Sequence, residues 1–113
     1  MLLRVETETR EGLALVTATG EIDAATAESL SSAIANALDE GTPRVIVDFS
    51  RVTFIDSTGL GVLVKAHRTA EARGATFAVV HPTPQTRKLI RVLGLDQLLH
   101  IYDSYDQALA DRA

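Results

Sequence analysis

Apolar and polar positions alternate over the first part of the chain. Residues 3–9 begin with this alternation and then become polar, which is typical of a half-exposed strand at a sheet edge. Residues 13–19 form a second, more apolar run, and the intervening Arg10-Glu11-Gly12 has the composition of a tight turn. The pattern predicts an N-terminal β-hairpin.

A helical period replaces the alternation once the chain has left the second strand. Leu30, Ile34 and Leu38 recur every four residues, which predicts an amphipathic helix over residues 24–40. Asp23 stands directly before this segment. Its carboxylate is therefore expected to cap the helix N-terminus.

The remaining sequence alternates between short apolar stretches and helical segments. Continuously apolar stretches are typical of buried central strands, and the helical segments end at glycines. The elements expected in chain order are strand 44–49, connection 50–55, helix 60–73, strand 76–80, a helix from Pro84 to Leu93 capped by Thr83, strand 98–102, and a short helix after a capping box at Ser104. Val52, Phe54 and Ile55 are expected to pack beneath the end of the sheet, and Leu89, Ile90 and Leu93 to face inward.

This element order predicts the fold class. Strands separated by helices need crossover connections and therefore run parallel to one another. A hairpin followed by alternating helices and strands then gives a mixed β-sheet covered by about four helices. We expect one α/β domain spanning residues 1–113.

Composition narrows the classes of function. The net charge of −4 and an aromatic content of 4% argue against nucleic-acid binding, which needs basic surface or stacking side chains. No cysteine is present, so disulfides and thiolate metal sites are excluded. No window approaches the ~20 apolar residues of a membrane span. A soluble, cytoplasmic protein without membrane insertion is expected.

The candidate functional stretch lies between the predicted strand 44–49 and the helix that follows. It reads Asp56-Ser57-Thr58-Gly59-Leu60-Gly61. Helix capping accounts for much of it, because Asp, Ser and Thr are all capping residues. Each glycine in the first helical turn, however, costs about 1 kcal/mol relative to alanine. A site that needs an accessible hydroxyl and bare backbone N–H groups would explain both glycines.

Enzyme signatures are missing from the sequence. It contains neither a GxGxxG nor a GxxxxGK[ST] phosphate loop, and Ile55 occupies the glycine position of a nucleophile elbow. His67, His81 and His100 are scattered without metal-ligand spacing. His67 is expected to pack inside the fold and the other two to lie at the surface. No enzymatic activity, metal or cofactor is therefore predicted.

Three segments together resemble a STAS domain. They are Gly20-Glu21-Ile22-Asp23, Ile46-Val47-Asp48-Phe49, and Phe54-Ile55-Asp56-Ser57-Thr58-Gly59-Leu60-Gly61-Val62. The similarity extends over nearly the whole chain and is strongest to the bacterial anti-sigma-factor antagonists. The long third segment combined with the upstream Gly-Glu-Ile-Asp is far more specific than either alone.

The resemblance implies a mechanism of partner switching. Members of this family bind an anti-sigma factor that is also an ATP-dependent serine kinase, and so release the sigma factor. The kinase phosphorylates the serine after the motif aspartate, here Ser57, and a metal-dependent serine phosphatase reverses the modification. Thr58 is the second choice of acceptor. Asp23 and Asp56 match acidic positions beside the serine, and the expected partner-binding residues are completed by Thr58, Gly59, Leu60 and Gly61.

Physical chemistry is compatible with such a switch. A phosphate is favoured at a helix N-terminus, here by the N–H groups of residues 59–61. Its charge of about −1.5 to −2 beside two aspartates would disfavour burial in an interface. Two alternatives stay open: a STAS scaffold or regulatory subunit of a stressosome-like or transporter complex, and a small-molecule or nucleotide-binding module or enzyme that uses Ser57.

Overall fold

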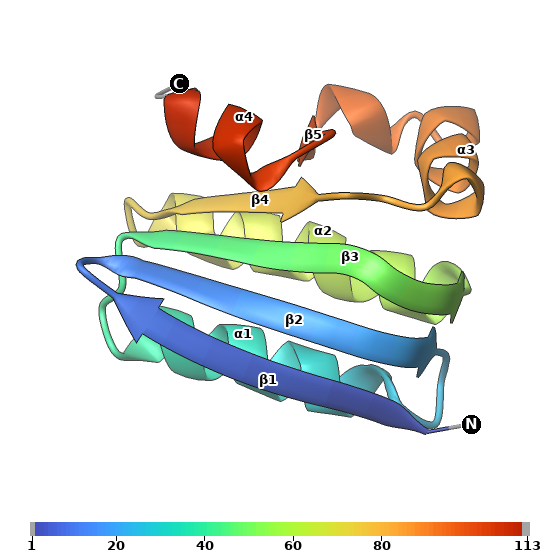
Figure 1. Ribbon diagram of the computed structural model, residues 1–113, viewed down its shortest axis with the longest axis horizontal. Coiled ribbons are helices and arrows are strands. Elements are labelled where there is room, and N and C mark those ends of the chain that lie inside the picture. The colour runs from blue at the N-terminus through green and yellow to red at the C-terminus, as the bar shows by residue number, and fades with distance from the viewer. Residues whose placement is uncertain (1, 112–113) are drawn as a thin grey trace.

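Five strands form one mixed sheet in the computed structural model, which describes residues 2–111 (Figure 1). The strands lie side by side in the order β1-β2-β3-β4-β5. The elements are β1 (Leu3–Arg10), β2 (Leu13–Ile22), α1 (Ala27–Asp39), β3 (Arg44–Ile55), α2 (Ser57–Ala72), β4 (Thr76–Val80), α3 (Pro84–Val92), the 3₁₀ helix η1 (Leu95–Gln97), β5 (His100–Tyr102) and α4 (Tyr105–Ala110). The α/β fold and the N-terminal hairpin are as predicted.

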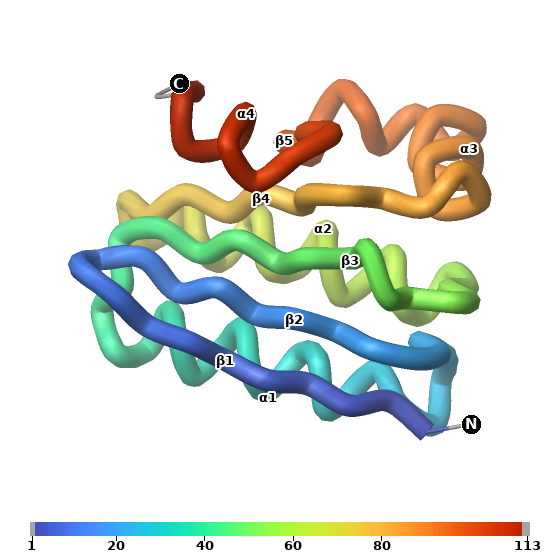
Figure 2. Tube along the Cα trace, viewed as in Figure 1, coloured from blue at the N-terminus to red at the C-terminus, as the bar shows by residue number. Residues whose placement is uncertain are grey.

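Strand directions follow from the connections. β1 and β2 are antiparallel and joined by a tight turn in which Glu11 and Gly12 both have positive φ. β2, β3, β4 and β5 are parallel neighbours. The chain crosses behind the sheet through α1 and again through α2, so these two helices cover the same face (Figure 2). No helix within residues 2–111 is long and apolar enough to cross a membrane.

The core is aliphatic and divided between the two faces of the sheet. Alternate residues of β2 are buried, and Val16, Val47 and Leu63 are fully enclosed in the cluster beneath α1 and α2. A smaller cluster on the other face contains Ile46 and Val80, which pack with Ala108 of α4. Burial of these faces is the main term that stabilises the fold.

β2 and β3 are longer than the sequence predicted. β2 continues to Ile22 instead of ending at residue 19, and residues 50–55 are strand instead of connection. The β2–β3 register shifts twice, because β3 advances further than β2 between Thr17 and Glu21. The extra residues lie on β3 and interrupt its alternation of buried and exposed residues, which explains why residues 50–55 were predicted as a connection.

Two apolar residues expected inside are exposed. Phe54 is 41% exposed and Leu93 is 55% exposed, whereas Val52, Ile55 and Ile90 are buried as predicted. Phe54 follows the second shift in register, and Leu93 is the C-cap residue of α3. Both lie where the regular pattern of an element ends.

The capping residues of α3 and α4 were predicted correctly from the sequence. Thr83 caps α3 by accepting from the Thr86 N–H at 3.2 Å, and Pro84 occupies the first turn. Ser104 caps α4 by accepting from the Gln107 N–H at 3.1 Å. Both predictions are confirmed. These caps could be predicted from the sequence because a cap depends on residues within one helical turn.

Candidate functional site

The candidate site lies at the carboxyl edge of the sheet, where β2 and β3 end together. Ile22 and Ile55 are register partners, so Asp23 and Asp56 each follow directly after a paired strand end. The Asp56 N–H donates to the Ile22 carbonyl at 3.2 Å, and this hydrogen bond links the end of β3 to the end of β2. The resemblance grouped Asp23 with Asp56, and the strand pairing brings them to the same edge.

Asp56 is the N-cap of α2. Its backbone is extended, and its Oδ1 accepts from the N–H groups of Thr58 at 2.9 Å and Gly59 at 3.2 Å. Its carbonyl accepts from the Leu60 N–H at 3.1 Å. The N–H groups of Gly59 and Leu60 were expected to receive a phosphate, but Asp56 already engages both. The sequence reasoning did not count the donors that the cap itself would use.

Ser57 and Thr58 are exposed in the first turn of α2. Among residues 2–111, no hydrogen bond involves either hydroxyl oxygen. In the described part of the chain no base accepts a hydrogen bond from Ser57, so its hydroxyl is displayed at the surface without an activating partner. Leu60, in contrast, is 3% exposed and belongs to the core, where a partner cannot reach it.

The two glycines of the stretch have different surroundings. A Cβ on Gly59 would lie 2.6 Å from Ile55 Cγ1 and 2.7 Å from Ile22 Cγ2, so only glycine lets α2 pack this closely on the strand ends. Gly61 is exposed, and a Cβ there would meet no described atom within 4 Å outside its chain neighbours and its own helix backbone. Packing explains Gly59 and leaves Gly61 unexplained.

Asp23 is not the helix cap that the sequence predicted. α1 begins at Ala27 with Thr26 as N-cap residue, and Asp23 instead closes the preceding turn. Asp23 Oδ1 accepts from the N–H groups of Ala25 at 2.9 Å and Thr26 at 3.1 Å. The Thr26 hydroxyl donates to the Glu21 carbonyl at 2.7 Å, a contact that the sequence reasoning missed. The fixed turn holds Asp23 in place beside the end of β2.

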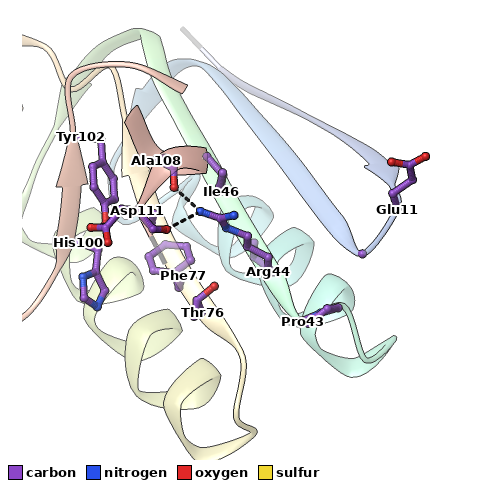
Figure 3. Close-up of a pocket in the computed structure, with 13 residues that line it drawn as sticks. Glu11, Pro43, Arg44, Ile46, Thr76, Phe77, His100, Tyr102, Ala108 and Asp111 are labelled. Atoms are coloured by element: carbon purple, nitrogen blue, oxygen red, sulfur yellow. Dashed lines mark hydrogen bonds between the residues drawn. The ribbon is translucent and has the colours of Figure 1, made fainter. Parts of the chain in front are cut away.

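A cavity of about 340 Å³ lies at the opposite end of the sheet (Figure 3). Arg44 projects into it from the start of β3 and donates to backbone carbonyls at the end of α4, those of Ala108, Leu109 at 3.4 Å and Asp111 at 3.0 Å. Sequence reasoning assigned no role to Arg44. Its partners lie more than sixty residues away, and no local pattern indicates them.

Tyr102 borders the same cavity, and its hydroxyl donates to the Asp111 carboxylate. Burial raises the pKa of Tyr102 to about 12, and the hydrogen bond to Asp111 and its negative charge act in the same direction, against the opposing charge of Arg44. These polar groups hold the C-terminal helix to the sheet.

His67 and His100 lie as expected, whereas His81, expected at the surface, is half-buried. His67 is 8% exposed on the packed side of α2, with its ring centroid 5.6 Å from that of exposed His100. No cluster of three or more His, Cys, Asp or Glu suited to a metal ion occurs in the part of the chain that the structure describes.

Comparisons with known proteins identify a family that matches most of this chain. Residues 4–108 match the family described as STAS domain. The anti-sigma-F factor antagonist RsfB of Mycobacterium tuberculosis (strain ATCC 25618 / H37Rv) is 33% identical over 100 residues, covering 87% of this chain and 80% of the relative. An anti-sigma F factor antagonist of Paenibacillus polymyxa is 27% identical over 112 residues, covering 98% and 96%.

A solved structure resembles the whole fold. The crystal structure of an anti-sigma factor antagonist from Mycobacterium paratuberculosis superimposes with a TM-score of 0.87 at 32% identity. The match covers 96% of this chain and 92% of the other.

Proposed function

The chain belongs to the STAS domain family, and from this membership we propose that it is an anti-sigma-factor antagonist controlled by phosphorylation of Ser57. In its unmodified form it binds an anti-sigma factor and thereby releases the sigma factor. It acts as a binding protein in the cytoplasm, where its partners work. The curated relatives compared above are named as antagonists of anti-sigma factors, which supports this function.

The observation that carries the proposal is the display of Ser57. Its hydroxyl is exposed in the first turn of α2, directly after the capping Asp56 at the shared exit of β2 and β3. The chain has no nucleotide-binding loop, so the phosphate comes from ATP bound by the partner. As the family resemblance implies, the anti-sigma factor is itself the serine kinase in this proposal. A metal-dependent serine phosphatase restores the hydroxyl.

The charges around Ser57 explain why modification would release the partner. Phosphate adds about −1.5 to −2 charges in the same turn as Asp56 and at the same edge as Asp23. Asp56 already occupies the Thr58 and Gly59 N–H groups, which therefore do not neutralise the phosphate unless they exchange partners. An unpaired, partly desolvated dianion at an interface costs several kcal/mol, and ~1.4 kcal/mol is a tenfold loss of affinity.

Substitution of Ser57 tests the proposal. Ser57→Ala is expected to bind the cognate anti-sigma factor as tightly as the unmodified protein, and to remain bound when ATP is added. Ser57→Asp is expected to bind at least about tenfold more weakly while keeping its melting temperature. Isothermal titration calorimetry measures both, and Thr9→Ala is the control, because it removes an exposed hydroxyl on β1 at the opposite end of the sheet.

Mass spectrometry after incubation with kinase and ATP locates the phosphate. Modification of Thr58 instead of Ser57, or a Ser57→Asp variant that binds as tightly as wild type, would contradict the proposed switch. A protein that stays unmodified and associates stably with transporter or stressosome-like components would instead be a STAS scaffold. Nucleotide binding or hydrolase activity of the isolated chain would favour the small-molecule alternative.

A further inference from the structure

A groove of about 310 Å³ runs between α1 and α2 beside the proposed phosphorylation site. From α1 it is lined by Ala27 and Glu28, and from α2 by Thr58, Gly61 and Lys65. Thr58 is the neighbour of Ser57 in the chain, so the groove opens within the same helical turn as the hydroxyl. Any kinase that encloses Ser57 must also cover the mouth of this groove.

Gly61 keeps the middle of the groove open. Glycine is the least favourable residue in a helix interior apart from proline, and at this position alanine would fit without contact. Gly59 in the same turn is required by the packing of Ile22 and Ile55, but no such requirement exists at Gly61. A destabilising glycine without a packing reason indicates that another molecule needs the space.

The walls of the groove define what fits. Its floor is uncharged, formed by small or apolar side chains such as Ala27 and Val62, while Glu28 and Lys65 stand on opposite helices. Across residues 2–111, no ion pair joins these two charges or involves Lys65. The groove is suited to an uncharged side chain flanked by polar groups that meet the two rim charges.

We propose that the anti-sigma factor inserts an uncharged side chain into this α1–α2 groove over Gly61 when it binds around Ser57. This inference rests on the proposed function and specifies the surface that the partner uses. The groove supplies contact area and shape complementarity, and the Ser57 turn supplies the switch. Phosphorylation then releases a partner whose anchor lies one turn away.

Substitutions of Gly61 separate its effect on partner binding from its effect on stability. Gly61→Ala is expected to raise the melting temperature of the free protein by about 4 °C, because it removes a helical glycine, and to weaken binding slightly. Gly61→Leu fills the groove and is expected to weaken binding by about tenfold or more with the fold intact. Ala72→Leu is the matched control, since it adds a leucine at the exposed end of the same helix, about 16 Å along its axis. This control is expected to bind like wild type.

Calorimetric titration of these variants and of Ser57→Asp with the same anti-sigma factor distinguishes the two proposals. If Ser57→Asp weakens binding and Gly61→Leu binds like wild type, the groove is not the contact surface and the switch stands. If Ser57→Asp has no effect, the proposed function fails whatever the Gly61 variants do. If Ala72→Leu weakens binding as much as Gly61→Leu, the effect is not specific to the groove and the inference is overturned.

Discussion

The two ends of the sheet both gather polar side chains, but they use them in opposite ways. At the amino end, Arg44 donates to carbonyls of α4, and Tyr102 donates to Asp111. At the carboxyl end, Asp56 and Asp23 organise the backbone of two turns, while the hydroxyl of Ser57 projects from the surface. One end joins distant parts of the chain to each other, and the other exposes the hydroxyl at which we propose that a partner acts.

This difference shows why the cavity beside Arg44 is not the better candidate site. The groups around the 340 Å³ cavity already bind one another, so a ligand there would have to replace bonds that stabilise α4. Modification of Ser57 breaks no hydrogen bond that the described residues make. Arg44 at the amino end should therefore contribute to stability and not to binding, whereas the Ser57 hydroxyl at the carboxyl end should contribute to binding and not to stability.

The largest effect on stability is expected from Arg44→Met. Loss of the guanidinium leaves the last carbonyls of α4 without their donor, and hydrogen bonds that involve a charged group contribute about 1.5–3 kcal/mol. We expect the free energy of unfolding to fall by about 2–3 kcal/mol in urea denaturation, with affinity for the anti-sigma factor unchanged.

Arg4→Met is the control for this prediction. Arg4 lies on β1 in an exposed ion pair with Glu6 at 3.5 Å, and such pairs contribute at most about 1 kcal/mol. If the two arginine variants unfolded at the same urea concentration, the contacts of Arg44 with α4 would contribute no more than a surface pair.

Gly59→Ala is expected to be the next largest effect. The new Cβ would force Ile22 and Ile55 to move, and overpacking of this kind costs about 1–3 kcal/mol, part of which the better helix propensity offsets. We expect a net loss of about 1 kcal/mol in thermal unfolding, opposite in sign to Gly61→Ala. If Gly59→Ala and Gly61→Ala changed the stability equally, the side chains of Ile22 and Ile55 would have moved away from the new Cβ at no cost.

Asp56→Ala removes the cap of α2 and is expected to cost about 1 kcal/mol. Asp56→Asn keeps an acceptor oxygen at the same position, so most of the stability should return while the negative charge is lost. Chemical denaturation of both variants measures the cap. A loss as large in the asparagine variant as in the alanine variant would mean that charge, not hydrogen bonding, stabilises the turn.

The last effect concerns Tyr102 and emerges only at alkaline pH, so it is absent under the conditions of the other measurements. Its folded pKa of about 12 lies above the ordinary value of 10.0, so the folded state holds the proton more tightly than the unfolded state. This contribution is complete below pH 10 and is lost as the pH rises from about 10 to 12. Thermal unfolding should show that loss in the wild type and a shallower one in Tyr102→Phe. If the melting temperatures of the two proteins fell in parallel over this pH range, the loss of stability would not come from Tyr102.

Much of the fold was predictable because it depends on local rules. Thr83 and Ser104 were identified as caps from sequence, and the apolar stretch 76–80 matches β4. The bulged half of β3 was missed because its register is set by pairing with β2 and not by its own alternation. Asp23 was misassigned as a cap because aspartate favours a turn and a helix start for the same reason, a carboxylate near free N–H groups.

The strand-to-helix junction at Asp56 was predicted from sequence, but the contacts within it were not. Both glycines gave the same signal, a cost in helix propensity, and only the contacts of Gly59 with Ile22 and Ile55 distinguish them. The engagement of the Gly59 N–H by Asp56 likewise depends on the geometry of the cap. No sequence pattern indicated the role of Arg44, because its partners come from the far end of the chain.

The spatial order of the strands has a consequence for synthesis of the protein. Because the sheet order β1-β2-β3-β4-β5 repeats the order of translation, each strand that leaves the ribosome adds to the edge formed just before it. Between completion of β3 and arrival of β4, Val45 and Val47 lie in an uncovered edge strand of the kind that promotes aggregation. The nascent chain is therefore most vulnerable while Asp56 and α2 are being made, and rapid docking of α2 shortens that interval.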